Sequence, residues 1–370
     1  MKYFYNIIIK RIALLLLLSP ITLSAQVLRD TSSLNLVKES IVDIYNLRFN
    51  DAREVCRKLD LSYPGHPVIH VLKGMITYWE NYPLIPSSPA RVSFENDMRK
   101  CIELCQGKIN PADVAEFLLA NLSARGMLLL FYTDNDMRKD VVPLAVSTYK
   151  YIRHSFDYTS IYTDFYFFTG VYNYYTVAYP EAYPVYKPLA LLFPKGDKIK
   201  GLNDLHTAAT NSILFKAEAS SFLSAICLSF ENNYEQAYEH SKYLHELYSA
   251  NIQYLSVFIK NLLLMKQYDE AERHVILCDT INSNSYCRAQ LAIFHGILQE
   301  KKYHNNKMAE QYYLEGINLM AAFGYFGNEY TAYGYFGLSR ISKLNADNNS
   351  SKTYLKKALE LADFKRVDFD

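Results

Sequence analysis

The residues of this chain that could take part in metal chemistry form small sets, and each set lacks a member that the chemistry requires. His66 and His70 lie four residues apart, a spacing that places two imidazoles on one helix face, where they could bind a metal ion. His66 precedes Pro67, however, which indicates a turn before the helix, and no Glu-rich partner helix is evident. The sequence therefore favours a turn residue over a metal ligand.

The acidic run Asp134-Asn135-Asp136, followed by Asp140, resembles part of a calcium loop, but the required glycine and terminal glutamate are missing. A solvated turn between helices is the better interpretation. The chain also contains no Gly-x-Ser-x-Gly motif, no phosphate-binding glycine loop and no Cys/His nucleophile signature. We therefore predict that the protein is not an enzyme and that it holds no cofactor and no metal.

The six cysteines have two interpretations. Their even number permits disulfides in an oxidising compartment. Their positions in apolar helices favour small buried hydrophobic residues instead. Cys101 and Cys105 share a helix face, but without a CxxC pair or a companion histidine a zinc site is weakly supported.

One phrase that occurs twice indicates which elements position these residues. Asn233–Ala237 (NYEQA) returns as Gln267–Ala271 (QYDEA), and the two alanines lie 34 residues apart. A period of 34 residues is the length of one helix–turn–helix unit in a stacked array. The same phrase begins at Phe49, with Leu59 and Pro64 at the expected later positions. In these residues the chain resembles the tetratricopeptide repeat (TPR) family, of the exported bacterial type.

This resemblance implies an all-α fold, a right-handed α-solenoid (superhelix) of TPR-like helix–turn–helix repeats across residues 26–370. The resemblance is strongest at 43–79 and 217–279. A proline-rich insert at about 176–200 interrupts it, and a more polar last helix is expected to cap the end. Glycine within a helix usually marks close helix–helix contact. The expected crossing glycines are Gly74, Gly126, Gly170, Gly296 and Gly337.

The first 25 residues are typical of a secretory signal peptide. Lys2, Lys10 and Arg11 form a basic region, the apolar run 12–18 follows, and Ala25 precedes Gln26 at the expected cleavage site. The apolar run is shorter than the ~20 residues that span a bilayer, which argues against a membrane anchor. The Ala-Gln junction resembles those of exported proteins of Gram-negative bacteria, so we expect a periplasmic protein, soluble or peripherally attached to the envelope, with no integral membrane segment after signal removal.

The charge of the mature chain argues against nucleic-acid binding. Cleavage after Ala25 removes three of the 39 basic residues and none of the 38 acidic ones, which leaves a net charge of about −2. Proteins that bind nucleic acid concentrate basic residues on one face. We therefore expect no nucleic-acid partner.

Tyrosine is unusually frequent, with 33 in the chain and ten between Tyr151 and Tyr186. In the TPR family the first helix of each repeat lines a concave groove, so the resemblance implies which aromatic residues face a ligand. Large, rigid aromatic side chains dominate many interfaces. The predicted binding residues are Tyr78, Trp79, Phe131, Phe167, Tyr174 and Tyr175. In an alternative interpretation, the insert at 176–200 folds back and fills the groove, so that these residues are ordinary core.

Two functions follow from this groove. The first is a non-enzymatic periplasmic scaffold that binds a protein or an extended peptide. The alternative is a glycan-binding protein, because tyrosine and tryptophan rings also fit sugar faces. Sugar sites need several polar groups beside the rings, and the predicted lining is poor in carboxylates, with Asp164 the main exception. The peptide hypothesis is therefore favoured.

Overall fold

A computed structural model describes residues 26–107, 109–184, 187–191, 193–280, 284–362 and 369. The predicted signal peptide, residues 1–25, lies outside this part of the chain. Across the described residues the regular structure is helical, without strands, as the sequence predicts. The handedness of the array and its superhelical form remain expectations from the resemblance.

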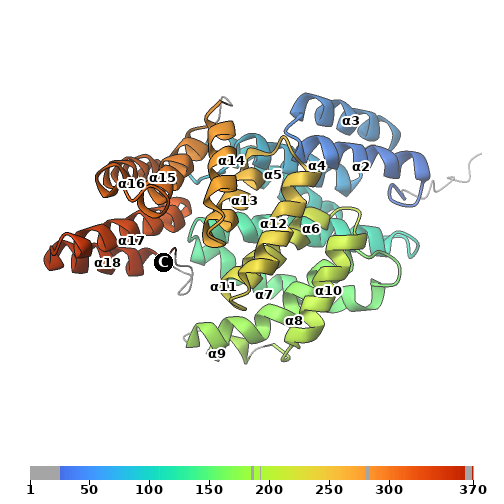
Figure 1. Cartoon of the computed structure of the whole chain (residues 1–370). Coiled ribbons are helices and arrows are strands. Elements are labelled where there is room, and N and C mark those ends of the chain that lie inside the picture. Colours follow the sequence, from blue (N-terminus) through green and yellow to red (C-terminus); the bar gives the residue numbers. More distant parts are fainter. Residues whose placement is uncertain are drawn as a thin grey trace, which may run out of the picture.

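Consecutive helices pack as antiparallel pairs in chain order (Figure 1). The pairs are α2 (Thr31–Tyr45) with α3 (Phe49–Ser62), α4 (Pro67–Glu80) with α5 (Ala90–Leu104), α6 (Val114–Asp134) with α7 (Arg138–Ser155), α8 (Phe165–Ala182) with α10 (Lys198–Asn211), α11 (Lys216–Ser229) with α12 (Tyr234–Leu247), α13 (Ile252–Leu264) with α14 (Tyr268–Thr280), α15 (Ser285–Lys301) with α16 (Asn306–Met320), and α17 (Asn328–Leu344) with α18 (Asn348–Leu361). Shorter elements are η1 (Phe156–Tyr158), α9 (Lys187–Ala190) and η3 (Ala321–Gly327). First helices of successive pairs also contact each other, as α4 does with α6 and α15 with α17.

The turn inside a pair has the same backbone form in most of the array. In each of these turns, a single residue that follows the first helix has a positive φ, and this residue is not glycine. They are Leu47, Asp136, Asn232, Lys266, His304 and Ala346. In several turns the next residue donates its N–H to the carbonyl five residues earlier, for example Gln267 to Leu262 at 2.9 Å. This bond closes a Schellman cap, which satisfies a free carbonyl at the helix end.

The left-handed residue in these turns predicts a stabilising substitution. Lys266 has φ 58° and is exposed. An L-residue in this conformation is strained by about 1 kcal/mol, and glycine is not. We expect Lys266→Gly to raise the free energy of unfolding by about 0.5–1 kcal/mol, because the larger entropy of the unfolded glycine chain offsets part of the gain. Urea denaturation of Lys266→Gly and of the control Lys266→Ala tests this, and a gain of the same size in the alanine variant would contradict it.

Most of the expected crossing glycines mark close contact between the two helices of a pair. A Cβ added at Gly74 would lie 2.1 Å from Met98 Cε of α5, and one at Gly296 would lie 2.6 Å from the Tyr313 ring of α16. Gly126 differs, since its nearest neighbour would be Phe168 at an ordinary 3.8 Å. A side chain at position 296 would therefore have to displace the Tyr313 ring, one at position 74 would displace only the flexible end of Met98, and one at position 126 would make ordinary contact.

The proline-rich insert begins later than the sequence suggested. Helix α8 continues through Pro180 to Ala182, so the first residues of the expected 176–200 insert are helical. The remainder packs on α7 and α8. The Phe193 ring lies edge-on to Tyr149 at 4.9 Å, and the Tyr172 hydroxyl donates to the Pro194 carbonyl at 2.6 Å. The described part of the insert also contacts two of the predicted binding residues. Lys198 Nζ lies 5.5 Å from the centre of the Tyr174 ring, and the nearby Tyr179 and Tyr183 raise the pKa of Tyr175 beyond the effect of burial.

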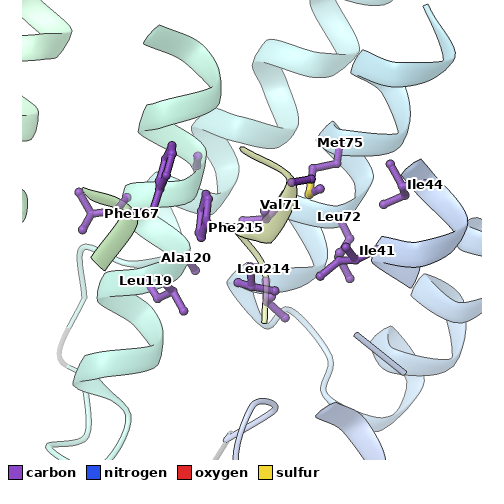
Figure 2. Close-up of a cluster of buried hydrophobic side chains, with 14 of the residues drawn as sticks. Ile41, Ile44, Val71, Leu72, Met75, Leu119, Ala120, Phe167, Leu214 and Phe215 are labelled. Carbon is purple, nitrogen blue, oxygen red and sulfur yellow. The ribbon is translucent and has the colours of Figure 1, made fainter. Parts of the chain in front are cut away.

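A different segment fills the space between the first helices of the N-terminal half. Figure 2 shows Leu214 and Phe215, which precede α11, among side chains from α2, α4, α6 and α8. The buried Asp164 carboxylate fixes this segment, because it accepts N–H bonds from Ile213 at 3.1 Å and from Leu214 at 2.5 Å. The Phe215 ring then stacks on Phe167 at 4.9 Å. The N-terminal half therefore has a hydrophobic core where the sequence suggested an open groove.

The array also closes on itself, since α2 and α4 contact helices about 200 residues later. The Asn251 side chain donates to the Tyr45 carbonyl at 2.9 Å, and the Asn284 side chain donates to the Tyr82 carbonyl at 2.8 Å. In Figure 1 the blue N-terminal helices accordingly lie beside the yellow and orange α13 and α14. A simple stack contacts only nearest neighbours, so this closure is an additional feature of the fold.

In the described part of the chain, one helix, α6, is long and apolar enough to cross a membrane. Of its most apolar window, 67% is buried inside the protein. Helix α6 also carries the buried Arg125, whose guanidinium bonds Asn121 at 2.8 Å and lies 4.5 Å from the centre of the Tyr151 ring. These contacts are those of a core helix.

Candidate binding surface

The contact between the two ends of the array is made of aromatic rings, which we call the closure cluster. Its members are Tyr45, Tyr78, Trp79, Tyr82, Tyr248, Tyr254, Tyr286 and Phe326. Tyr254 of α13 contacts Trp79 of α4 with ring centroids 5.4 Å apart, and Tyr82 contacts Tyr286 of α15 at 6.1 Å. Edge-to-face contacts of this kind are typical of stable aromatic packing.

Part of this cluster reaches the surface. Tyr45, Tyr78, Tyr248, Tyr254 and Tyr286 are buried, whereas Trp79, Tyr82 and Phe326 are partly exposed. Trp79 and Tyr82 stack on each other with centroids 5.2 Å apart and an interplanar angle of 14°. Phe326 lies edge-on to Tyr82 at 5.6 Å. These three rings form a rigid apolar patch with an exposed edge.

A carboxylate without a partner lies beside this patch. Asp134, the last residue of α6, is partly exposed, and among the described residues its side chain has no hydrogen bond or ion pair. Desolvation raises the pKa of this carboxyl to about 7. Burial raises the pKa of Tyr82, and the negative charges of Asp134 and Glu329 raise it further. Asn135, the residue after Asp134, donates to the Leu84 carbonyl at 3.1 Å, which places the end of α6 beside the segment that carries Tyr82. A ligand that donates a hydrogen bond or carries positive charge would therefore stabilise the ionised form of Asp134.

The second acid of this region is already paired. Glu329 of α17 accepts from Lys260 Nζ at 2.8 Å and from the Tyr333 hydroxyl at 2.7 Å. Burial raises its pKa, but Lys260 and the Tyr333 hydrogen bond outweigh burial, so the pKa of Glu329 is lowered. Glu329 is thus ionised near neutral pH and held by the protein's own groups.

A third acid lies deeper at the same closure. Glu218 of α11 accepts a hydrogen bond from the Tyr45 hydroxyl, while its other carboxylate oxygen is buried without a partner. Desolvation raises the pKa of Glu218 to about 7, although the Tyr45 bond lowers it.

We call the exposed part of this region the Tyr82 surface. It comprises Trp79, Tyr82, Phe326, Asp134 and Glu329.

The six predicted binding residues do not lie together on one open surface. Tyr78, Phe131, Phe167 and Tyr174 are buried, and Trp79 and Tyr175 are partly exposed. The buried residues are covered by other rings, as Phe131 is by Phe94 at 5.6 Å and Phe167 is by Phe215. Only Trp79 of the six belongs to the Tyr82 surface. A role of these residues in binding stays a prediction.

Sequence reasoning missed most of the Tyr82 surface. Tyr82 follows the helix that supplies Trp79, and Asp134 was interpreted as a solvated turn residue. One available signal was the position of Asp134 on its helix. It lies seven residues, or two turns, after Met127, which follows the expected crossing residue Gly126 and which the resemblance places on the groove side. Contacts with Tyr286 and Phe326 could not be expected from a stack of neighbouring repeats.

The candidate metal ligands are separated by the fold. His66 caps α4 and its ring lies 3.3 Å from Glu116, whereas His70 bonds Asp97 at 2.9 Å. Among the described residues, no group of three or more His, Cys, Asp or Glu side chains could hold a metal ion. The six cysteines are all buried and none of them forms a disulfide, in agreement with small buried hydrophobic residues.

A cavity of about 340 Å³ lies between α3, α4 and α5, and its lining includes no residue of the Tyr82 surface. Its lining includes Arg53, Arg57 and Lys73, which could suggest an anion site. Each of these cations is paired, however. Lys73 bonds Asp60 at 3.1 Å, Arg57 bonds Glu54 at 2.8 Å, and Arg53 bonds Glu80. The cavity therefore offers no free charge to a ligand.

No protein-family model matches the chain, and no curated protein matches it.

Proposed function

We propose that this protein is an exported TPR-like scaffold, coiled as a right-handed superhelix, which binds an extended segment of another protein in the periplasm. The succession of helix pairs supports this architecture. The left-handed turn residues Asn232 and Lys266 lie 34 residues apart, which matches the period of the repeated phrase. The proposal is of a binding protein rather than an enzyme.

The observation that carries the binding proposal is the Tyr82 surface. It combines three partly exposed aromatic rings with an unpartnered carboxylate, Asp134, that is already desolvated. A few aromatic anchors usually supply most of the binding free energy of an interface. A charge-assisted hydrogen bond to a desolvated carboxylate adds about 1.5–3 kcal/mol. A peptide that presents a lysine, an arginine or backbone N–H groups beside an apolar side chain fits both parts.

Glycan binding is the second candidate, and one observation favours it. The charges of Asp134 and Glu329 both act on the Tyr82 hydroxyl, so carboxylates that the predicted lining lacked belong to this region. A sugar, however, stacks on a free ring face. The faces of Trp79 and Tyr82 are stacked on each other, and Phe326 and Tyr254 approach them edge-on. The Tyr82 surface therefore fits a peptide better.

Neutralising Asp134 is expected to weaken partner binding about tenfold, which is the loss of about 1.4 kcal/mol of charge-assisted bonding. The experiment compares wild type with Asp134→Asn by affinity capture from periplasmic extract, followed by titration of each captured species. Glu246→Gln is the matched control, because Glu246 is exposed on α12 outside the Tyr82 surface. Protease and glycosidase treatment of the captured material separates a peptide from a glycan. A species bound equally by wild type and Asp134→Asn would contradict the proposed surface.

A further inference from the structure

A residue beyond the last helix pair is buried against α17. Phe369 is 4% exposed, although α18 ends at Leu361. Its ring lies edge-on to Tyr333, with centroids 4.9 Å apart and an interplanar angle of 90°. Phe369 is itself in neither helix nor strand. A large apolar side chain beyond the last helix pair therefore occupies a site on a first helix of the array.

This site adjoins the Tyr82 surface through Glu329. The Tyr333 hydroxyl donates to Glu329 at 2.7 Å, and the two residues lie one turn apart on α17. Glu329 is partly exposed, whereas Tyr286 and Tyr330, the rings that connect Tyr82 with Tyr333 through the core, are buried. A segment that passes Glu329 on the Tyr82 surface is therefore one helical turn from the Tyr333 site.

We propose that the Tyr333 site is an anchor for an aromatic side chain of the bound segment, and that Phe369 occupies it in the same molecule and competes with the partner. This inference rests on the proposed function and names one feature of the partner, a phenylalanine or similar ring. Phe369 supplies the argument for that chemistry, because it is an aromatic residue that the site already holds. Side chains on segments outside packed helices are released more easily than those within them.

The competing segment is available as a probe. A fluorescent peptide with the sequence of residues 361–370, LADFKRVDFD, is titrated into the full-length wild type and into full-length Phe369→Ala. We expect at least tenfold tighter binding to Phe369→Ala, because its site is empty. Phe364→Ala is the matched control, since it removes the same side chain five residues earlier and should leave peptide binding as in wild type. A peptide with alanine in place of its second phenylalanine should not bind.

Three results would overturn the inference. Equal affinity of wild type and Phe369→Ala for the peptide would show that Phe369 does not compete. Loss of helical circular dichroism in Phe369→Ala, and likewise in the milder Phe369→Leu, would make Phe369 a structural core residue. A wild-type dimer that Phe369→Ala converts to monomer, measured by sedimentation, would place the segment of a second copy in the site.

The outcome of this experiment can be distinguished from the outcome of the test of the proposed function. Peptide uptake by Phe369→Ala without a captured periplasmic partner would support the Tyr333 site and count against the proposed scaffold. Capture that depends on Asp134, without peptide uptake, would do the reverse.

Discussion

Tyr254→Ala should lower the free energy of unfolding by about 3–5 kcal/mol, the usual cost of removing a large buried aromatic side chain. Tyr254 is 5% exposed and contacts Tyr45, Trp79 and Tyr248 with ring centroids 6.0, 5.4 and 5.9 Å away. These contacts join α13 to α2 and α4, so the substitution removes the centre of the closure cluster. Urea denaturation monitored by circular dichroism measures the effect.

The control for this prediction is Tyr254→Phe. Among the described residues, the Tyr254 hydroxyl has no hydrogen-bond partner, so the phenylalanine variant keeps the ring contacts and should be within about 0.5 kcal/mol of wild type. Hydrogen exchange adds a spatial test, because Tyr254→Ala should expose the amides of α2–α4 more than those of α15–α18. Equal loss of protection at both ends would show that closure does not hold the N-terminal helices in place.

The second large effect is a pH dependence set by Asp134. Its folded pKa is about 7, above the usual 3.8, so the folded state binds more protons than the unfolded state between these values. Stability contributed by this group is therefore present below about pH 4 and is lost as the pH rises to 7. Such a rise in pKa corresponds to ~4 kcal/mol for a fully buried carboxyl, and the partial exposure of Asp134 reduces the expected loss to about 2 kcal/mol.

Asp134→Asn should remove this dependence. We expect the variant to unfold with the same free energy as wild type at pH 4 and to be about 2 kcal/mol more stable at pH 8. Glu329→Gln is the contrasting control, because the pKa of Glu329 is lowered and its contribution is present above its unfolded value of 4.5. That variant should be less stable than wild type at pH 7 and should approach it as the pH falls. The raised pKa of Asp134 would be contradicted if the free energies of unfolding of wild type and Asp134→Asn differed by the same amount at pH 4 and at pH 8.

The stability prediction and the binding prediction for Asp134 together describe a carboxylate that destabilises the folded protein when no partner is bound. The same substitution, Asp134→Asn, is expected to stabilise the chain and to weaken partner binding. Opposite effects of this kind are common where a binding group is kept in a desolvated position. Because the variant should be more stable than wild type, a loss of binding could not be attributed to misfolding.

Local features of this fold could be predicted from the sequence because they depend on neighbouring residues. His66 and Pro67 begin α4 as a cap and first-turn residue, and the loop at 81–89 separates α4 from α5. Gly74 and Gly296 mark helix contacts because a Cβ at either position would meet a side chain of the partner helix. The phrase at Tyr234 and Tyr268 begins α12 and α14. Periodicity and turn chemistry contain this information.

Contacts between distant helices could not be predicted in the same way. The stacking of Phe215 on Phe167, and the contact of Tyr82 with Tyr286, depend on how far each pair rotates relative to the previous one. That rotation depends on many individual side-chain contacts, and no short sequence motif predicts it. The aromatic excess was visible in the sequence. Its division between core rings such as Tyr174 and surface rings such as Trp79 required the three-dimensional arrangement.

The bond from Asn251 to the Tyr45 carbonyl joins residues 206 positions apart, and it changes how such a chain can fold. An open repeat array has low contact order, so any pair of helices can nucleate and the ends can fray independently. Here the final step must bring the first helices to α13 and α15 and meet the entropy of closing a very long loop. The array should therefore unfold more cooperatively than an open stack, and release of the N-terminal helices from α13 and α15 should be its first step.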